Sequence, residues 1–307
     1  MTADQLVALL AAAVTAGTPL VLAGVGELLA ERSGVLNLGV EGVMLVGAVV
    51  GFAAVVATAA PWLGVVAAVG AGALLGVGHA FLTVTLGAEQ VTTGLALALF
   101  GTGLSAFVGK PFIGIPNPAP FRALAVPGLA DVPVLGPIFF RQDALVYLSY
   151  MLPLVVWWWL VRTRPGLHLR ACGENPEAAD AMGVDVAAVR YGAVVAGAAL
   201  AGLAGGYLSL AYTPAWTENM TGGLGWIAIA LVVFATWHPG RLLAGAYLFG
   251  AVDVLGFRAQ LLGVQASSIV LRMLPYLFTL TVLLVITALR QAAGMPGALG
   301  RPYFREE

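Results

Sequence analysis

Apolar stretches long enough to cross a membrane recur along this chain, and they restrict its fold more than any other feature. About 20 consecutive apolar residues span the hydrocarbon core of a bilayer, which is about 30 Å thick. Only 9% of the residues are charged, whereas soluble domains carry about 25%, so most of the surface is suited to lipid. The predicted spans are 5–28, 35–59, 62–86, 91–109, 142–161, 191–213, 225–237, 241–257 and 269–290.

The backbone of these spans finds no water inside a bilayer, so it must form helices or a closed barrel. Stretches such as 277–286 are apolar throughout and lack the alternation of barrel strands. The sequence therefore predicts an all-α, polytopic membrane protein with about 8–10 transmembrane helices, in one transmembrane domain over residues 1–307. The stretch 225–237 is short for a full crossing, so it either re-enters the membrane or pairs with its neighbour.

Basic residues near the span ends predict the orientation, because cytoplasmic loops carry an excess of Lys and Arg. The predicted spans put more of these residues on one side than on the other. We therefore expect the first side to be cytoplasmic, with the N-terminus outside and the C-terminus inside. That side holds Arg32, Arg162, Arg164, Arg170, Arg190, Arg241, Arg290, Arg301 and Arg305, and the other holds Lys110, Arg122, Arg141, Arg258 and Arg272.

A proline-rich loop, residues 110–141, is predicted on the outside. Its seven prolines restrict the backbone and remove hydrogen-bond donors, so we expect no regular helix there. Apolar side chains such as Phe112 and Phe121 lie between the prolines and suggest that the loop packs on the membrane domain as a lid. A plain connector remains the alternative.

The longest polar interruption, residues 162–190, is predicted to be a cytoplasmic loop with a short helix. Asn175 suits the N-cap, Pro176 suits the first helical position, and Gly183 suits the left-handed turn after the last. About two helical turns are too short to be stable alone. Ala178 and Met182 give the helix a small apolar face. It either docks into a groove on a partner or is an ordinary helix between spans.

A second polar motif, residues 33–42, leads into the second span. Gly34, Asn37 and Glu41 would share one helical face. An ionisable residue at this depth is costly and usually faces a pathway or a partner. Asn37 could instead bond Glu41 within the helix, so a transport role and a structural role both stay open.

Further polar residues occur at two other places in or beside the spans. Thr92 and Thr93 lie at the start of the fourth span. The predicted outside turn 216–221 begins at Trp216, contains Glu218 and Asn219, and leads to Trp226. Aromatic faces beside carboxylate and amide groups suit a sugar or nucleobase, whereas an interfacial aromatic belt with a polar cap is the alternative.

Several motifs of known chemistry are missing from the sequence. No G-x-x-x-x-G-K-[ST] motif occurs, so we expect ATP hydrolysis to lie on another chain. The single cysteine and three separated histidines predict no metal site, and no catalytic set is found. No basic patch supports nucleic-acid binding. We expect a chain that is not an enzyme and holds no cofactor itself.

The two polar motifs resemble a known family. Residues 36–48 (LNLGVEGVMLVGA), 169–191 (LRACGENPEAADAMGVDVAAVRY) and 217–240 are similar to the membrane permeases of bacterial ABC importers for branched-chain amino acids, simple sugars and nucleosides. The similarity is strongest to the shorter permease of the nucleoside branch, and it covers most of the chain.

The resemblance implies a subunit that forms the pathway for nucleosides, or a related simple sugar, by alternating access in the bacterial inner membrane. Its partners would be an ABC ATPase that binds ATP and Mg, a second permease in a heterodimer, and an extracytoplasmic binding protein. The implied ATPase-coupling residues are Gly173, Glu174, Asn175, Pro176, Ala179, Met182 and Gly183. The candidate pathway residues are Asn37, Glu41, Thr92, Thr93, Glu218, Asn219 and Trp226.

One other class of function stays open. An ion-coupled secondary transporter would act without an ATPase and would use a buried carboxylate, Glu41 or Asp253, to bind the driving ion.

Overall fold

The computed structural model describes most of the chain. It covers residues 3–261 and 294–304, together with Met273, Leu277, Leu280, Thr281 and Leu284. The predicted span 269–290 therefore lies largely outside the described residues.

Six helices of the described chain are long and apolar enough to cross a membrane. They coincide with the first six predicted spans, and π-helical turns extend two of them to Thr85 and Tyr212. The prediction of a helical, polytopic membrane protein is confirmed. The six are α1 (Ala3–Arg32), α2 (Val40–Thr58), α3 (Pro61–Ala80), α4 (Gln90–Gly109), α6 (Ala144–Arg162) and α9 (Val186–Tyr207).

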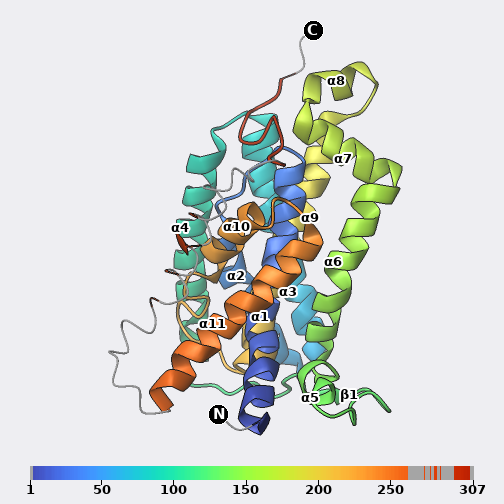
Figure 1. The fold of residues 1–307 in the computed structure, drawn as a ribbon. Helices are drawn as coiled ribbons and strands as arrows, with labels where there is room; N and C mark the ends of the chain where they lie inside the picture. The colour runs from blue at the N-terminus through green and yellow to red at the C-terminus, as the bar shows by residue number, and fades with distance from the viewer. Residues whose placement is uncertain are drawn as a thin grey trace.

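Two more helices follow α9. Helix α10 (Leu224–Phe234) has 11 residues, so it is only about 16 Å long, roughly half the thickness of a bilayer core. Helix α11 (Pro239–Leu261) returns along α1 toward the end of the molecule where the chain begins (Figure 1). The pair is joined by a tight turn, residues 235–238.

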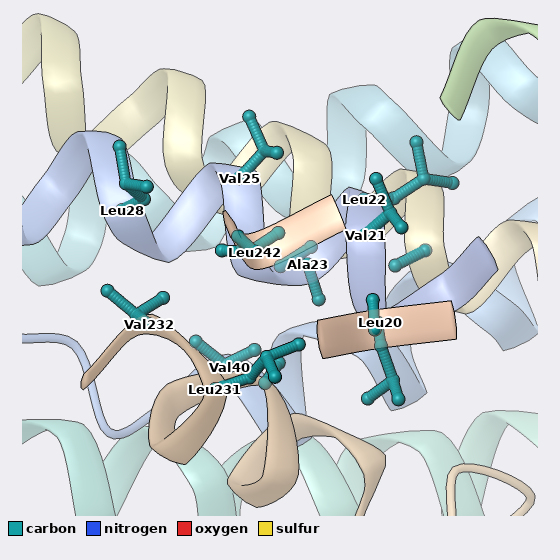
Figure 2. Packing of buried hydrophobic residues seen from close by; sticks show 14 of the residues in the cluster. Leu20, Val21, Leu22, Ala23, Val25, Leu28, Val40, Leu231, Val232 and Leu242 are labelled. Carbon is teal, nitrogen blue, oxygen red and sulfur yellow. The ribbon is translucent and has the colours of Figure 1, made fainter. Parts of the chain in front are cut away.

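The centre of the bundle is formed by α1, α2 and α9. In their most apolar windows, 78% of α9 and 72% of α2 is buried, compared with 22% of α4. Leu20 and Leu28 of α1 belong to the same buried cluster as Leu231 of α10 and Leu242 of α11, and Figure 2 shows these side chains between the helices. Helices α3, α4 and α6 lie outside and expose large apolar side chains, as membrane-facing helices do.

Glycines let two of these helices approach closely, and a tyrosine satisfies a carbonyl that a proline leaves unbonded. A Cβ on Gly72 would lie 2.9 Å from Cα of Gly202, so the missing side chains let α3 and α9 come into close contact. Pro19 cannot donate to the carbonyl of Thr15, and the hydroxyl of Tyr207 donates to it instead at 3.2 Å. A polar group freed inside the bundle is thus satisfied from a neighbouring helix.

The proline-rich loop packs against the bundle at the end opposite α8 (Figure 1). Asn117 donates its backbone N–H to Pro214 at 3.0 Å, and the ring of Phe121 lies 5.1 Å from that of Trp62. The expectation of no regular helix was wrong, because Leu135–Phe139 forms α5 and residues 110–112 form a 3-10 turn. Two short strands, β1 (Leu124–Ala125) and β2 (Arg141–Gln142), also pair within this region.

The opposite end carries α7 (Arg164–Glu174), α8 (Pro176–Ala181) and the segment 294–304 (Figure 1). Helix α7 was not predicted. It begins where the side chain of Thr163 accepts a hydrogen bond from the backbone N–H of Gly166, and Pro165 occupies its first turn.

Candidate functional site: a surface helix and a buried helix break

Helix α8 has the local structure that its sequence predicts. Asn175 Oδ1 accepts the backbone N–H of Ala178 at 3.0 Å, and Gly183 follows the helix with φ of 81°. Met182 is 84% exposed, and Ala178 beside it is exposed as well. An exposed methionine on a short, well-capped helix is suited to contact with another protein.

The other face of this region lies against the bundle. Ala179 is 4% exposed and packs with Cys172 and Val186. Gly173 is also buried, and its Cα lies so close to the backbone carbonyl of Arg32 that no Cβ would fit. These two candidate coupling residues therefore connect α7 and α8 to the spans, whereas Met182 is available outside.

A cavity of about 430 Å³ opens beside α8. Asp180 and Gly183 form one side of it, Arg190 lies on α9, and Tyr303 and Phe304 come from the C-terminal segment. The surface around α8 is thus convex at Met182 and concave next to it. That shape is suited to an interlocking contact with a partner.

The second motif is a break between two helices rather than part of one. Helix α1 ends at Arg32 and α2 begins only at Val40, so Gly34, Asn37 and Glu41 do not share a helical face. The prediction of a common face was wrong. Residues 35–37 are neither helix nor turn, although Val35 and Asn37 are buried.

The backbone of this break is bonded by side chains from three distant positions. Leu36 donates its N–H to Gln90 Oε1 at 2.7 Å, and its carbonyl lies 3.2 Å from His79 Nε2. Asn37 donates its N–H to Glu27 Oε1 at 2.9 Å. Irregular backbone is tolerated at membrane depth only where protein satisfies its polar groups, and these contacts do so.

Glu41 joins the first turn of α2 to the start of α10. Its carboxylate is 6% exposed and accepts the hydroxyl of Thr221 at 2.6 Å and the N–H groups of Gly223 and Gly225 at 2.8 and 2.7 Å. A carboxylate at a helix N-terminus satisfies free N–H groups and complements the helix dipole. A Cβ on Gly225 would lie 2.5 Å from the backbone nitrogen of Glu41, so only glycine fits this approach.

The structure separates the remaining candidate pathway residues. Trp226 lies in the first turn of α10, next to the Glu41 contact, and is 39% exposed. Glu218 and Asn219 are exposed in the connection before it. Thr92 and Thr93 lie in the first turn of α4, where hydrogen bonds from Thr92 lower the pKa of the capping residue Glu89.

The segment 216–221 is only partly exposed, because its two ends are buried in the bundle. Thr221 reaches Glu41 inside the bundle. Trp216 was expected either at the membrane interface or against a bound solute, but it is 1% exposed and packs with Val49 and Phe52. Its large ring fills a gap beside Gly109, where no Cβ would fit.

Sequence reasoning missed several residues that organise this site. Glu27 and Glu31 lie one turn apart near the end of the first span, and His79 lies near the end of the third. All three are buried, at 2%, 1% and 1% exposed. The sequence could have indicated these residues, because ionisable residues inside apolar spans are rare and usually have specific partners. In the described part of the chain, no group of three or more metal-binding side chains is found.

The family match and the three relatives described here are all transport permeases. Residues 9–288 match the family described as the permease component of branched-chain amino acid transport systems. The chain is 43% identical to "Putative glucose ABC transporter permease protein TsgC13" of Haloferax volcanii, over 97% of this chain and 98% of that protein. It is 36% identical to the guanosine ABC transporter permease protein NupQ of Bacillus subtilis, over 94% and 93%. It is 33% identical to the nucleoside ABC transporter permease protein NupC of Lactococcus lactis, over 87% and 88%.

Proposed function

This chain belongs to the family of permease components of branched-chain amino acid transport systems, and we propose that it forms the translocation pathway of an ATP-binding-cassette importer for nucleosides or a related simple sugar. ATP and Mg would bind a separate ATPase subunit, and the pathway would open alternately to either side. A second, different permease and an extracytoplasmic binding protein would complete the importer in the inner membrane of the cell.

The surface around α8 is the observation that carries the coupling to an ATPase. Met182 is exposed on a helix that Asn175 caps, beside a cavity of about 430 Å³. The inner face of the same region is bonded and packed against the ends of α1 and α9. A force applied at Met182 would therefore be carried into the spans. The proposal puts this end in the cytoplasm, with the first residues of α1 outside.

The contacts at the start of α10 favour the proposal that the transported solute is uncharged. A free helix N-terminus attracts anions, but here the carboxylate of Glu41 already accepts the N–H groups of Gly223 and Gly225. A sugar or nucleoside would need only neutral hydrogen bonds and an apolar or aromatic surface, which Trp226 could supply. The names of the three relatives refer to glucose, guanosine and nucleosides, which are uncharged solutes of this kind.

The ion-coupled alternative depended on Glu41 or Asp253. Both oxygens of Glu41 are engaged by Thr221 and the start of α10, so this carboxylate has a structural use that needs no ion. The structure gives Asp253 no comparable set of partners among the described residues, and no observation favours it as an ion site.

Purification of the detergent-solubilised chain from its native membrane tests the proposal first. We expect a P-loop ATPase and a second permease to co-purify, and uptake into liposomes to require ATP. Recovery of this chain alone, with uptake driven by an ion gradient in the absence of ATP, would refute the importer and establish the carrier.

Exposed residues on either side of α8 then test the coupling surface. Met182→Asp or Glu174→Arg should lower the recovery of the ATPase by about tenfold while the protein still inserts in the membrane. Met295→Asp is a matched control, because Met295 is 60% exposed in the segment 294–304 and does not lie on α8. Equal recovery of the ATPase with all three variants would contradict docking at α8.

A further inference from the structure

The turn between α10 and α11 has an unusual backbone. Thr236 and Trp237 both have positive φ, of 49° and 52°, in the left-handed region that L-residues rarely adopt. Two consecutive non-glycine residues in this conformation need surrounding contacts that hold them there. Arg241 of α11 donates to the hydroxyl of Thr236, and the contacts that hold Trp237 include several from the end of α1.

Trp237 makes those contacts through both its side chain and its backbone. The ring is 4% exposed, and Nε1 donates to Glu31 Oε2 at 2.5 Å. The carbonyl of Trp237 accepts Nε and Nη2 of Arg32 at 3.3 and 3.1 Å. The guanidinium of Arg32 is charged, and hydrogen bonds from charged groups are among the stronger ones in proteins, so the turn is tied to the last turn of α1.

One of these two residues of α1, Arg32, also meets the region that carries α8. Nη1 of Arg32 lies 3.9 Å from Glu174 Oε1, and its backbone carbonyl lies against Gly173. Arg32 therefore contacts α7 on one side and the α10–α11 turn on the other. Because Glu41 holds the far end of α10, a displacement of the turn would tilt α10 against α2.

We propose that Trp237 is a positioning residue for transport, which fixes the α10–α11 turn to Glu31 and Arg32 and so carries a displacement of α7 and α8 to α10. The inference rests on the proposed function, because it assigns the route from the ATPase-coupling surface to the pathway. It also predicts that the link exists in the isolated chain.

Trp237→Phe tests the hydrogen bond while it keeps most of the ring. Trp216→Phe is a matched control, because Trp216 is equally buried and its Nε1 has no hydrogen-bond partner in the part of the chain that the structure describes. In the purified complex reconstituted in liposomes, we expect Trp237→Phe to lower solute transported per ATP hydrolysed by about tenfold or more, and Trp216→Phe to leave this ratio within about twofold. Equal effects of the two variants on this ratio would overturn the proposal.

A distance measurement tests the link without any ATPase. Spin labels at Met182→Cys, directly after α8, and at Ala244→Cys on α11 are both at exposed positions, and the single native cysteine, Cys172, is buried. We expect a broader distribution of the label distance with Trp237→Phe and an unchanged one with Trp216→Phe. An unchanged distribution in both would refute the link even if transport is lost.

Variants of Glu31 separate the hydrogen bond from ring packing. Glu31→Gln keeps an oxygen that can accept from Trp237 and should retain the narrow distance distribution, whereas Glu31→Leu should broaden it as Trp237→Phe does. If both Glu31 variants behave alike, the bond does not position the turn. Failure of an ATPase to co-purify would refute the proposed function and leave these distance results to decide the link.

Discussion

Helix α8 and the break between α1 and α2 are both short, polar interruptions of an apolar chain, but they are stabilised in opposite ways. The cap of α8 comes from its own neighbour, Asn175, and the turn after it from Gly183. The backbone of the break is bonded by Glu27, Gln90 and His79, which lie on three other elements. A surface element can be specified locally because water satisfies the rest, whereas a buried one needs partners from elsewhere.

The two kinds of stabilisation suit the two proposed roles, contact with a partner for α8 and packing inside the bundle for the break. An element that contacts a partner gains from an exposed apolar side chain such as Met182. An element inside the bundle gains from having every polar group paired, because an unpaired buried group costs about 1–3 kcal/mol. The following changes should separate the two kinds of stabilisation, from the largest effect to the smallest.

Glu41→Ala should have the largest effect on the fold. It leaves the hydroxyl of Thr221 and the N–H groups of Gly223 and Gly225 without their acceptor. We therefore expect the free energy of unfolding to fall by roughly 3 kcal/mol or more. Thermal unfolding in detergent would measure it. Glu89→Ala is the control, since Glu89 also caps a helix N-terminus but is exposed, and it should cost less. If both variants lose a similar free energy of unfolding, burial does not make the Glu41 contact more stabilising than the exposed cap at Glu89.

Gln90→Leu should weaken the break locally. The N–H of Leu36 loses its acceptor in a partly buried position, at a cost of about 1 kcal/mol. Hydrogen exchange of the Leu36 amide should become about tenfold faster or more. The amide of Asn37 is an internal control, because Glu27 still accepts it. Unchanged exchange at Leu36 would show that Gln90 does not hold the break.

Asn175→Ala should have the smallest effect on the whole protein. It removes the cap of α8 and should destabilise that helix by about 1 kcal/mol, while global unfolding changes little because Asn175 and Ala178, which form the cap, are exposed. Exchange of the α8 amides and the global melting temperature, measured together, would test this. Asn175→Asp keeps a capping oxygen and should restore protection. A global loss as large as that of Glu41→Ala would contradict the local character of α8.

Predictions about the site succeeded where the determining residues are neighbours in sequence. Asn175, Pro176 and Gly183 specify α8 by themselves, and the six long spans follow from continuous apolar stretches. Predictions failed where distant residues decide. The helical pattern of Gly34, Asn37 and Glu41 continues without interruption in the sequence, but polar side chains from other helices offered the backbone of residues 35–37 a better set of bonds.

Trp216 illustrates the same limit for an apolar residue. Tryptophan beside polar residues is typical of both a membrane interface and a solute site, and the sequence could not choose between them. In the structure it is buried against Gly109, whose missing side chain leaves the space for the ring. The sequence around Trp216 does not indicate a contact with Gly109, nor does the sequence around Gly109 indicate one with Trp216.

The sequence by itself determined that this chain is a helical membrane protein, where its long spans lie and which short helix it presents at the surface. These properties depend on apolar length and on caps within a few residues, and local physics is sufficient for them. Only the tertiary structure decided that Glu41 caps α10, that residues 35–37 leave the helix, and that Arg32 joins α7 to the α10–α11 turn. Each of these pairs residues far apart in the chain, because a polar group buried in an apolar bundle must take whichever partner the packing brings to it.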